Sequence, residues 1–148
     1  MDKSSVRILV VDDDQRLLAL LDDTLASIGY TTSNVSSGNE ALFLLSKKVY
    51  DLVITDISMP EMDGLELLNK IRKSYPKLPV ILITGVARPE VIAKAHPEGF
   101  LTKPFRISHL EAIIEKTILR PNEKIHANTR SILVIDDDDV FEKNRSKN

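Results

Sequence analysis

Several short apolar runs of this sequence end in a residue that could do chemistry. The first run ends in the carboxylates of Asp12 and Asp13, and the third ends in Asp56. The fourth ends in the hydroxyl of Thr84 and the fifth in the ammonium of Lys103. Carboxylates that share a small crevice repel one another, and a hard divalent cation removes that repulsion. The residue types therefore indicate a metal-assisted reaction of a carboxylate.

One carboxylate nucleophile, one metal ion, one ammonium and one hydroxyl are together enough for phosphoryl transfer. Mg²⁺ prefers oxygen ligands, keeps several waters and is usually held by one or two carboxylates plus phosphate oxygens. We expect Asp13 and Asp56 to be direct ligands, with Asp12 in an outer role. Lys103 suits a phosphate oxygen as a compact charge, and Thr84 offers a donor. The pattern predicts phosphoryl transfer to Asp56, driven mainly by positioning and charge stabilisation.

The apolar runs must form strands for these residues to meet. Apolar runs at 7–11, 52–55, 79–84 and 100–102, and a weaker strand at 30–35 that is polar enough for a sheet edge, alternate with stretches of helical period, which is typical of an α/β domain with a parallel sheet. Right-handed crossovers then give a three-layer sandwich whose five-stranded parallel sheet has the order 2-1-3-4-5. Ligands of such sheets bind beyond the carboxyl ends of the strands. The candidate residues are therefore expected at one edge.

Capping residues mark the ends of the first two expected helices. Asp14 precedes a stretch with apolar residues every three or four positions, and Gly29 can close that helix in a left-handed cap. Ser37 and Glu40 have the spacing of a capping box and open the next helix. Each of these helices follows a predicted strand.

The later helices carry weaker signals. A turn-rich loop at 59–64 leads to the third helix. Pro89 can start a short fourth helix, because its missing N–H costs nothing at a first helical position. Ser108 is expected to cap a last helix that ends near Leu119, because Pro121 follows.

The composition is that of an ordinary globular domain. Of 148 residues, 43% are apolar and 28% charged, which predicts one domain with its own core. The formal net charge of -2 gives no general attraction to nucleic acid or to an anionic membrane. Without cysteine there is no disulfide or thiolate site, and no apolar run approaches the roughly 20 residues of a membrane span. We expect a soluble, cytoplasmic domain.

Together, the residues at the strand ends resemble those of a known family, the receiver domain of two-component response regulators. The resemblance covers about residues 6–120. It is specific because an acidic pair, a lone aspartate, a threonine and a Lys-Pro pair end successive strands. The segments that carry it are Val11-Asp12-Asp13, Thr55-Asp56-Ile57-Ser58-Met59-Pro60, Ile83-Thr84-Gly85 and Lys103-Pro104-Phe105.

The resemblance implies a flavodoxin-like fold and a role in signal transduction. A sensor histidine kinase or a histidine phosphotransfer protein would donate a phosphoryl group from a phosphohistidine to Asp56. The domain would catalyse only its own modification and would not be an enzyme for other substrates. Mg²⁺ or Mn²⁺ would be held by Asp12, Asp13, Asp56 and the backbone carbonyl of Ser58.

The resemblance also implies a conformational switch. Thr84 and Phe100 fall at the family's switch positions, where the hydroxyl moves toward the phosphoryl group and the aromatic ring turns inward. The bond between Lys103 and Pro104 would be cis. Ser58 falls at a position that sets the lifetime of the phosphorylated state, and so does residue 86.

Other interpretations of these residues stay open. A binding module with this fold and no chemistry would not need Asp56, Thr84 and Lys103 together. A phosphatase with an aspartyl nucleophile usually carries a second aspartate two positions later, where this chain has Ser58. Taken alone, Asp56 could be a turn residue and Phe100 a core residue.

Two stretches depart from the family pattern. The chain takes only 19 steps from Thr84 to Lys103, fewer than is usual in receivers, and the missing residues fall in the fourth helix. We therefore expect that helix to be short or irregular, which puts the family's common dimer through this face in doubt. Phosphoacceptance is not affected by this departure.

The second departure is an internal repeat. The stretch 132–138 repeats the stretch 8–14 after a polar linker at 121–130. We divide the chain into a receiver domain at 1–120, the linker, and a truncated start of a second receiver at 131–148. The chain would then be a fragment of a tandem-receiver protein, such as a hybrid kinase. The alternative is a terminal tail with a chance match.

An orphan strand would also affect association. The segment 131–135 would expose backbone groups and apolar side chains, so it should seek a sheet edge or an apolar groove in its own or a neighbouring molecule. We expect concentration-dependent self-association through this segment. The acidic run at 136–139 resembles a metal site, but a solvated run is the default interpretation.

Overall fold

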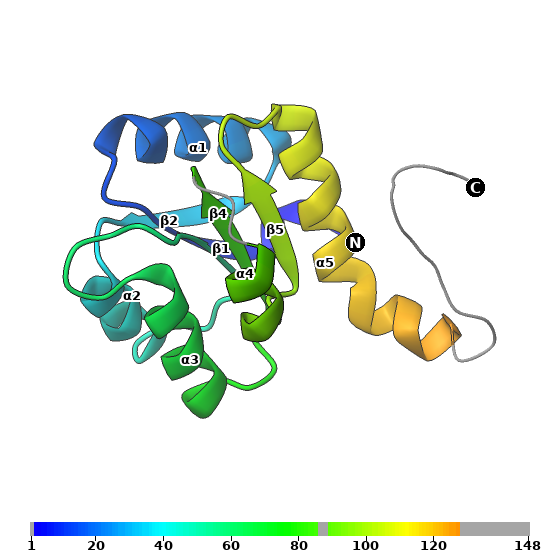
Figure 1. Ribbon diagram of the computed structural model, residues 1–148. Coiled ribbons are helices and arrows are strands. Elements are labelled where there is room, and N and C mark those ends of the chain that lie inside the picture. Colours follow the sequence, from blue (N-terminus) through cyan, green and yellow to red (C-terminus); the bar gives the residue numbers. More distant parts are fainter. Residues whose placement is uncertain (1, 86–88, 128–148) are drawn as a thin grey trace. The chain divides into compact units, whose positions relative to one another are not determined.

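A five-stranded sheet between two layers of helices forms the protein (Figure 1). The computed structural model describes residues 2–85 and 89–127. The strands are β1 (Arg7–Val11), β2 (Thr31–Val35), β3 (Leu52–Asp56), β4 (Val80–Thr84) and β5 (Gly99–Thr102). The helices are the 3-10 helix η1 (Lys3–Ser5) and α1 (Gln15–Ile28), α2 (Gly38–Leu45), α3 (Gly64–Ser74), α4 (Pro89–Ala95) and α5 (Ile107–Ala127).

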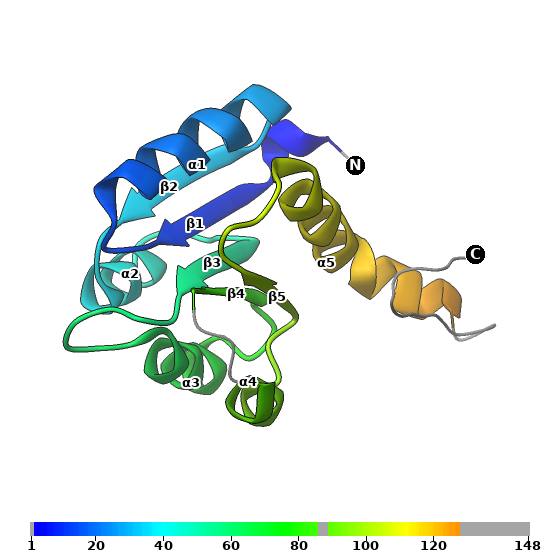
Figure 2. The ribbon, with the colours of Figure 1, turned by 45° about the horizontal axis from the view of Figure 1, so that its top comes forward.

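The sheet has the topology that the sequence predicts. Its strands are all parallel and lie in the order β2-β1-β3-β4-β5 (Figure 2). The strand after β2 is added on the other side of β1, so β1 and β3 are neighbours. Val11 pairs with Thr55 at their carboxyl ends. The residues that follow, Asp12 and Asp56, therefore leave the sheet side by side.

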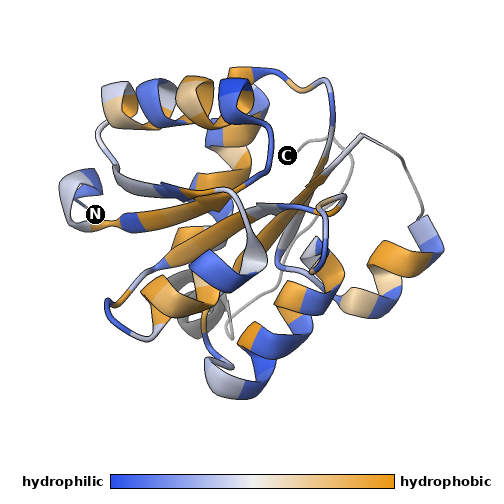
Figure 3. Ribbon diagram, turned by 90° about the vertical axis from the view of Figure 1, so that its left-hand side faces the viewer, coloured by the Kyte–Doolittle hydropathy of each residue, from blue (hydrophilic) through white to orange (hydrophobic). Residues whose placement is uncertain are grey.

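The core lies on both faces of the sheet. Helices α1 and α5 cover one face, and α2, α3 and α4 cover the other (Figure 1). Alternate residues of β1 serve the two sides: Ile8 belongs to the cluster with α1 and α5, and Leu9 to the cluster with α2 and α3. A strand covered on both faces reads as a continuous apolar run, and Figure 3 shows these apolar strands between amphipathic helices.

The expected caps are present on the first two helices. The Asp14 side chain accepts from the N–H groups of Arg16 and Leu17 at the start of α1. Gly29 ends α1 with a φ of 122°, a conformation that glycine adopts without a side-chain clash. At α2, the Ser37 hydroxyl accepts from the N–H of Glu40.

Two expectations about α5 are wrong. The helix begins at Ile107, so Ser108 lies inside the first turn and does not cap it. The helix also continues through Pro121 to Ala127 and does not end near Leu119. A proline removes one N–H donor and crowds the preceding turn, but the helical bonds before and after it can still form. The first part of the expected linker is therefore helical.

Helix α4 is short, as the spacing predicts, with seven residues starting at Pro89. The turn after it is held by Arg72 of α3, whose two terminal nitrogens each lie 2.9 Å from a carboxyl oxygen of Glu98. Arg72 also donates to the carbonyl of His96 at 2.8 Å, and Glu98 accepts from the N–H of Val80 at 2.8 Å. This Arg72–Glu98 clamp fastens the turn to α3 and to the start of β4.

Main-chain contacts divide the chain into the units Met1–Ile118 and Leu119–Asn148. The repeat at 131–148 lies outside the described residues, as do the strand expected at 131–135 and the acidic run at 136–139, so all three stay predictions. In the part of the chain that the structure describes, no helix has the length and apolar character to cross a membrane.

Candidate functional site

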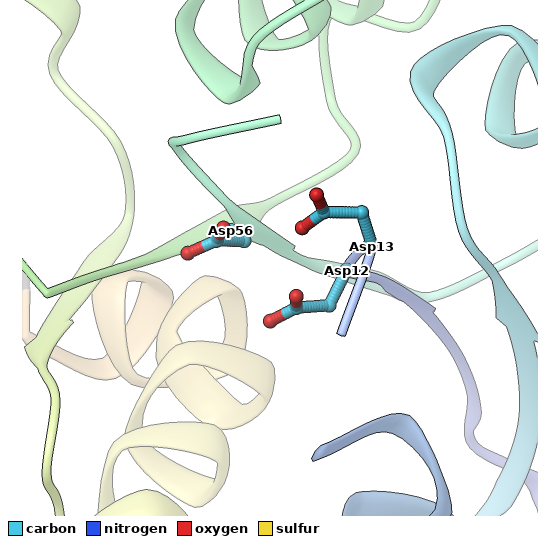
Figure 4. Close-up of side chains that lie close together, drawn as sticks. All are labelled: Asp12, Asp13 and Asp56. Atoms are coloured by element: carbon cyan, nitrogen blue, oxygen red, sulfur yellow. The ribbon is translucent and has the colours of Figure 1, made fainter. Parts of the chain in front are cut away.

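Three carboxylates meet at the carboxyl edge of the sheet. Asp12 and Asp13 follow β1, Asp56 is the last residue of β3, and their side chains point toward a common space (Figure 4). One oxygen from each lies within 4.8 Å of the others. Asp12 is 2% exposed and Asp56 5%, whereas Asp13 is exposed. The crevice thus has two buried acids and one that faces solvent.

Lys103 brings a positive charge into the same crevice. Its Nζ lies 3.2 Å from Oδ1 of Asp56 and 3.3 Å from Oδ2 of Asp12. The backbone N–H of Lys103 donates to the carbonyl of Thr84 at 2.7 Å, which ties the end of β5 to the end of β4. The peptide bond between Lys103 and Pro104 is cis, as the resemblance implies.

Asp12 is held on both of its carboxyl oxygens. Oδ1 accepts from the N–H of Asp14 at 2.9 Å, and Oδ2 faces Lys103. The N–H of Asp12 donates to the carbonyl of Val35 on β2. A carboxylate with protein donors on both oxygens is suited to an outer position beside a metal ion. Direct ligation by Asp13 and Asp56 stays a prediction.

The electrostatics of the crevice follow from burial and crowding. Burial raises the pKa of Asp56, and the charge of Asp12 raises it further. Burial also raises the pKa of Asp12, although the hydrogen bond from Asp14 and the charge of Lys103 act against it. For Lys103, burial lowers the pKa, but Asp12 and Asp56 outweigh burial and the pKa is raised. One ammonium therefore faces more negative charge than it neutralises.

This donor set fits a hard divalent cation. An ion such as Mg²⁺ binds oxygens at about 2.1 Å, so its ligands lie up to about 4 Å apart. One oxygen from each of the three carboxylates lies within 4.8 Å of the others, close to that spacing. A divalent charge would also stabilise the charged forms of Asp12 and Asp56, which burial disfavours. The chemistry of the residues present thus agrees with a magnesium or manganese site.

The remaining predicted residues lie around this crevice to different extents. Thr84 ends β4 and is buried. Ser58 and Thr84 both line a cavity of about 570 Å³ that α4 borders with Val91 and Ile92. Phe100 lies half-buried on the edge strand β5. It lines a separate groove with residues of the β5–α5 loop and α5, so the structure does not bring Phe100 into the carboxylate cluster.

Sequence reasoning missed Gly64 and Thr55. The hydroxyl of Thr55 donates to the carbonyl of Asp56 at 2.9 Å. Gly64, the first residue of α3, packs directly on the main chain of Asp56. The sequence does hold a signal for Gly64. It directly follows Asp63, the N-cap of α3, and a glycine at the start of a helix close to the nucleophile can indicate a position with no room for a side chain.

Fold and site together define the class of protein: a small doubly wound α/β domain with a carboxylate and lysine crevice at the carboxyl edge of its sheet. The sequence model described as "Response regulator receiver domain" matches residues 8–115. The chain therefore belongs to the response regulator receiver domain family. This finding agrees with the resemblance that the strand-end motifs carry.

Curated relatives are transcriptional regulators. The chain is 38% identical over 118 residues to the DNA-binding transcriptional regulator NtrC of Salmonella typhimurium, covering 78% of this chain and 25% of NtrC. It is 35% identical over 121 residues to the transcriptional regulatory protein ZraR of Escherichia coli O157:H7, covering 80% of this chain and 27% of ZraR. The chain thus spans about a quarter of the length of these relatives.

Solved structures of receiver domains share the fold. A response regulator receiver domain protein from Clostridium thermocellum superposes with a TM-score of 0.75 at 29% identity, covering 80% of this chain and 98% of that one. The response regulator TrrA of Thermotoga maritima superposes with a TM-score of 0.70 at 35% identity, covering 76% and 98% of the two chains. That structure of TrrA is a complex with Mg²⁺ and BeF.

Proposed function

We propose that this chain is the phosphoacceptor of a two-component phosphorelay and that Asp56 receives the phosphoryl group. The observation that carries the proposal is the crevice itself. Asp56 is buried between a second acid, Asp12, and the ammonium of Lys103, at the sheet edge where α/β proteins bind ligands. A buried nucleophile beside a cation suits attack on a phosphoryl group, because the cation can stabilise the negative charge on the phosphoryl oxygens in the transition state.

The proposed reaction is one in-line transfer. An oxygen of Asp56 bonds to phosphorus while the bond from phosphorus to the imidazole nitrogen of a donor phosphohistidine breaks. The product is an acyl phosphate on Asp56 and a neutral or protonated histidine on the donor. Water later attacks phosphorus and releases inorganic phosphate, which restores the carboxylate.

Each neighbour of Asp56 has a proposed role. Lys103 binds a phosphoryl oxygen in place of the Asp56 oxygen that it faces now. The Thr84 hydroxyl approaches the phosphoryl group and, with Phe100, reports its presence to the surface. Asp12, Asp13, Asp56 and the carbonyl of Ser58 hold Mg²⁺ or Mn²⁺. The bound metal would neutralise charge on the phosphoryl oxygens.

The partners follow from the family and from the length of the chain. A sensor histidine kinase or a histidine phosphotransfer protein is the proposed donor. The whole of NtrC is described as DNA-binding, but this chain matches only a quarter of it, so we assign no nucleic-acid contact to the described residues. We place the domain in the cytoplasm, where a kinase finds ATP. We also propose that two copies of the chain associate through residues 131–135.

Intact-protein mass spectrometry tests the phosphoacceptor proposal. The chain is incubated with Mg²⁺ and acetyl phosphate beside Asp56→Asn, which removes the nucleophile without changing the size of the side chain. We expect one added phosphoryl group that is absent in the variant and absent after chelation. An unmodified wild-type chain would instead favour a binding module that has the fold without the chemistry.

A further inference from the structure

The main chain of Asp56 is enclosed by the start of helix α3. The N–H of Gly64, the first residue of that helix, donates to the carbonyl of Ile57 at 2.8 Å. A β-carbon at position 64 would lie 2.2 Å from the carbonyl oxygen of Asp56 and 2.8 Å from the Cα of Ile57. Both are main-chain atoms that cannot rotate away. Any other residue at position 64 must therefore displace the backbone of the phosphoacceptor or the start of α3.

The same carbonyl oxygen is held from a second direction. The hydroxyl of Thr55 donates to it at 2.9 Å, and Thr55 is completely buried. The loop that follows is anchored as well, because Met59 and Met62 are buried in the core beside α2 and α3. The backbone from Asp56 through Ser58 is thus held by Thr55 on one side, by the buried methionines after it and by Gly64 of α3.

We propose that Gly64 is a positioning residue for the metal ion and the phosphoryl group. The inference rests on the proposed function of Asp56. Because α3 closes directly on the Asp56 and Ile57 main chain, residue 64 fixes where the Asp56 side chain leaves β3 and where the segment carrying Ser58 begins. A β-carbon there misplaces two of the proposed oxygen ligands without touching either of them.

Other glycines of the chain do not carry this constraint. A β-carbon on Gly38 would meet only side-chain atoms of Met62, one on Gly99 only side-chain atoms of Ile81 and Ile113, and one on Gly85 nothing within 4 Å. Gly29 has a φ of 122°, which would strain any residue with a side chain, but it lies at the end of α1, at the sheet edge opposite the crevice. Gly29→Ala is therefore a control that loses stability through backbone strain far from the carboxylates.

Calorimetric titration with Mg²⁺ tests the inference on the full chain. We expect Gly64→Ala to raise the Mg²⁺ Kd about tenfold or more, the usual effect of disturbing a residue that orients metal ligands. Gly29→Ala should keep the wild-type Kd while losing stability. Equal Kd values for Gly64→Ala and wild type would overturn the inference, and so would an equal rise in the Gly29→Ala control.

A second variant decides the matter if Gly64→Ala does not fold. Thr55→Val removes the other contact to the Asp56 carbonyl without adding an atom, and we expect a Kd raised several-fold (about 3-fold or more). An unchanged Kd would overturn the inference. Phosphorylation of wild type by acetyl phosphate is measured separately. If it fails while the Kd series behaves as expected, the phosphoacceptor role fails and the positioning role of Gly64 stands for the metal ion alone.

Discussion

At the scale of single residues, the buried carboxylates of the crevice lower the stability of the folded protein. Asp12 and Asp56 are buried together, and burial raises the pKa of each; the charge of Asp12 raises the pKa of Asp56 further. Lys103 compensates for part of this charge. Buried carboxylates with perturbed pKa values cluster at functional sites. Without a metal ion, the ionised crevice should therefore weaken the fold.

The raised pKa values of Asp12 and Asp56 predict that the stability of the metal-free protein, measured in chelator, depends on pH. A folded-state pKa above the ordinary value means that the stabilising contribution is complete below the unfolded pKa of about 3.9 and is lost as pH rises through the folded pKa. The free energy of unfolding should fall over that window by about 1.4 kcal/mol for each unit of pKa shift. Urea unfolding at a series of pH values measures it.

Matched variants separate the crevice from the rest of the protein. Asp12→Asn should be more stable than wild type at neutral pH in chelator and should show a smaller fall of stability with pH, while the part of the fall that comes from the buried Asp56 remains. The control is Asp23→Asn, because Asp23 is exposed on α1. Saturating Mg²⁺ should narrow the difference in the free energy of unfolding between wild type and Asp12→Asn, since an ion that binds the folded wild-type crevice stabilises it. If Asp12→Asn were less stable than wild type in chelator, the charged crevice would not be destabilising the fold.

At the scale of elements, the sequence predicts those features of the fold and the site that depend on a single strand or a single turn. Asp12, Asp56, Thr84 and Lys103 could be found because each follows its own apolar run, and parallel strand order brings the ends together. Gly64 could not, since its constraint comes from the path of the loop back to Asp56. The prediction that α5 ends near Leu119 is wrong, because a proline weakens a helix without always ending it.

The Arg72–Glu98 clamp is a second feature that sequence alone hides, because its partners are 26 residues apart. It fastens the turn after the shortened α4. Arg72→Ala removes two charge-assisted bonds to Glu98 and one to the His96 carbonyl. We expect a loss of about 1–2 kcal/mol in the free energy of unfolding, because the pair is partly exposed. Urea unfolding beside the exposed Lys70→Ala checks this value, and equal stability of the two variants would count against the clamp.

At the scale of the whole molecule, the chain is a receiver domain followed by residues whose role rests on sequence. It spans about a quarter of NtrC and ZraR, so any output is proposed to lie in a partner or in further sequence. The repeat at 132–138 has the pattern of β1, whose residues 8–11 are among the most buried of the chain. An apolar strand without its own sheet should promote association.

Sedimentation at several concentrations tests this expectation. The full chain should self-associate as its concentration rises, and the chain ending at Arg130 should stay monomeric. Replacing Leu133 and Ile135 with lysine in the full chain is a control that keeps the length while removing the apolar pattern. A full chain that is monomeric at every concentration would contradict the proposal without touching the phosphoacceptor site.

The central claim is that Asp56 itself accepts the phosphoryl group. Borohydride reduces an aspartyl phosphate to homoserine, so reduction after acetyl phosphate and Mg²⁺ treatment, followed by peptide mass mapping, identifies the modified residue. The crevice geometry predicts homoserine at position 56 and unmodified Asp12 and Asp13. Homoserine at either of those residues, or a stable phosphate ester on Ser58 or Thr84, would contradict the assignment.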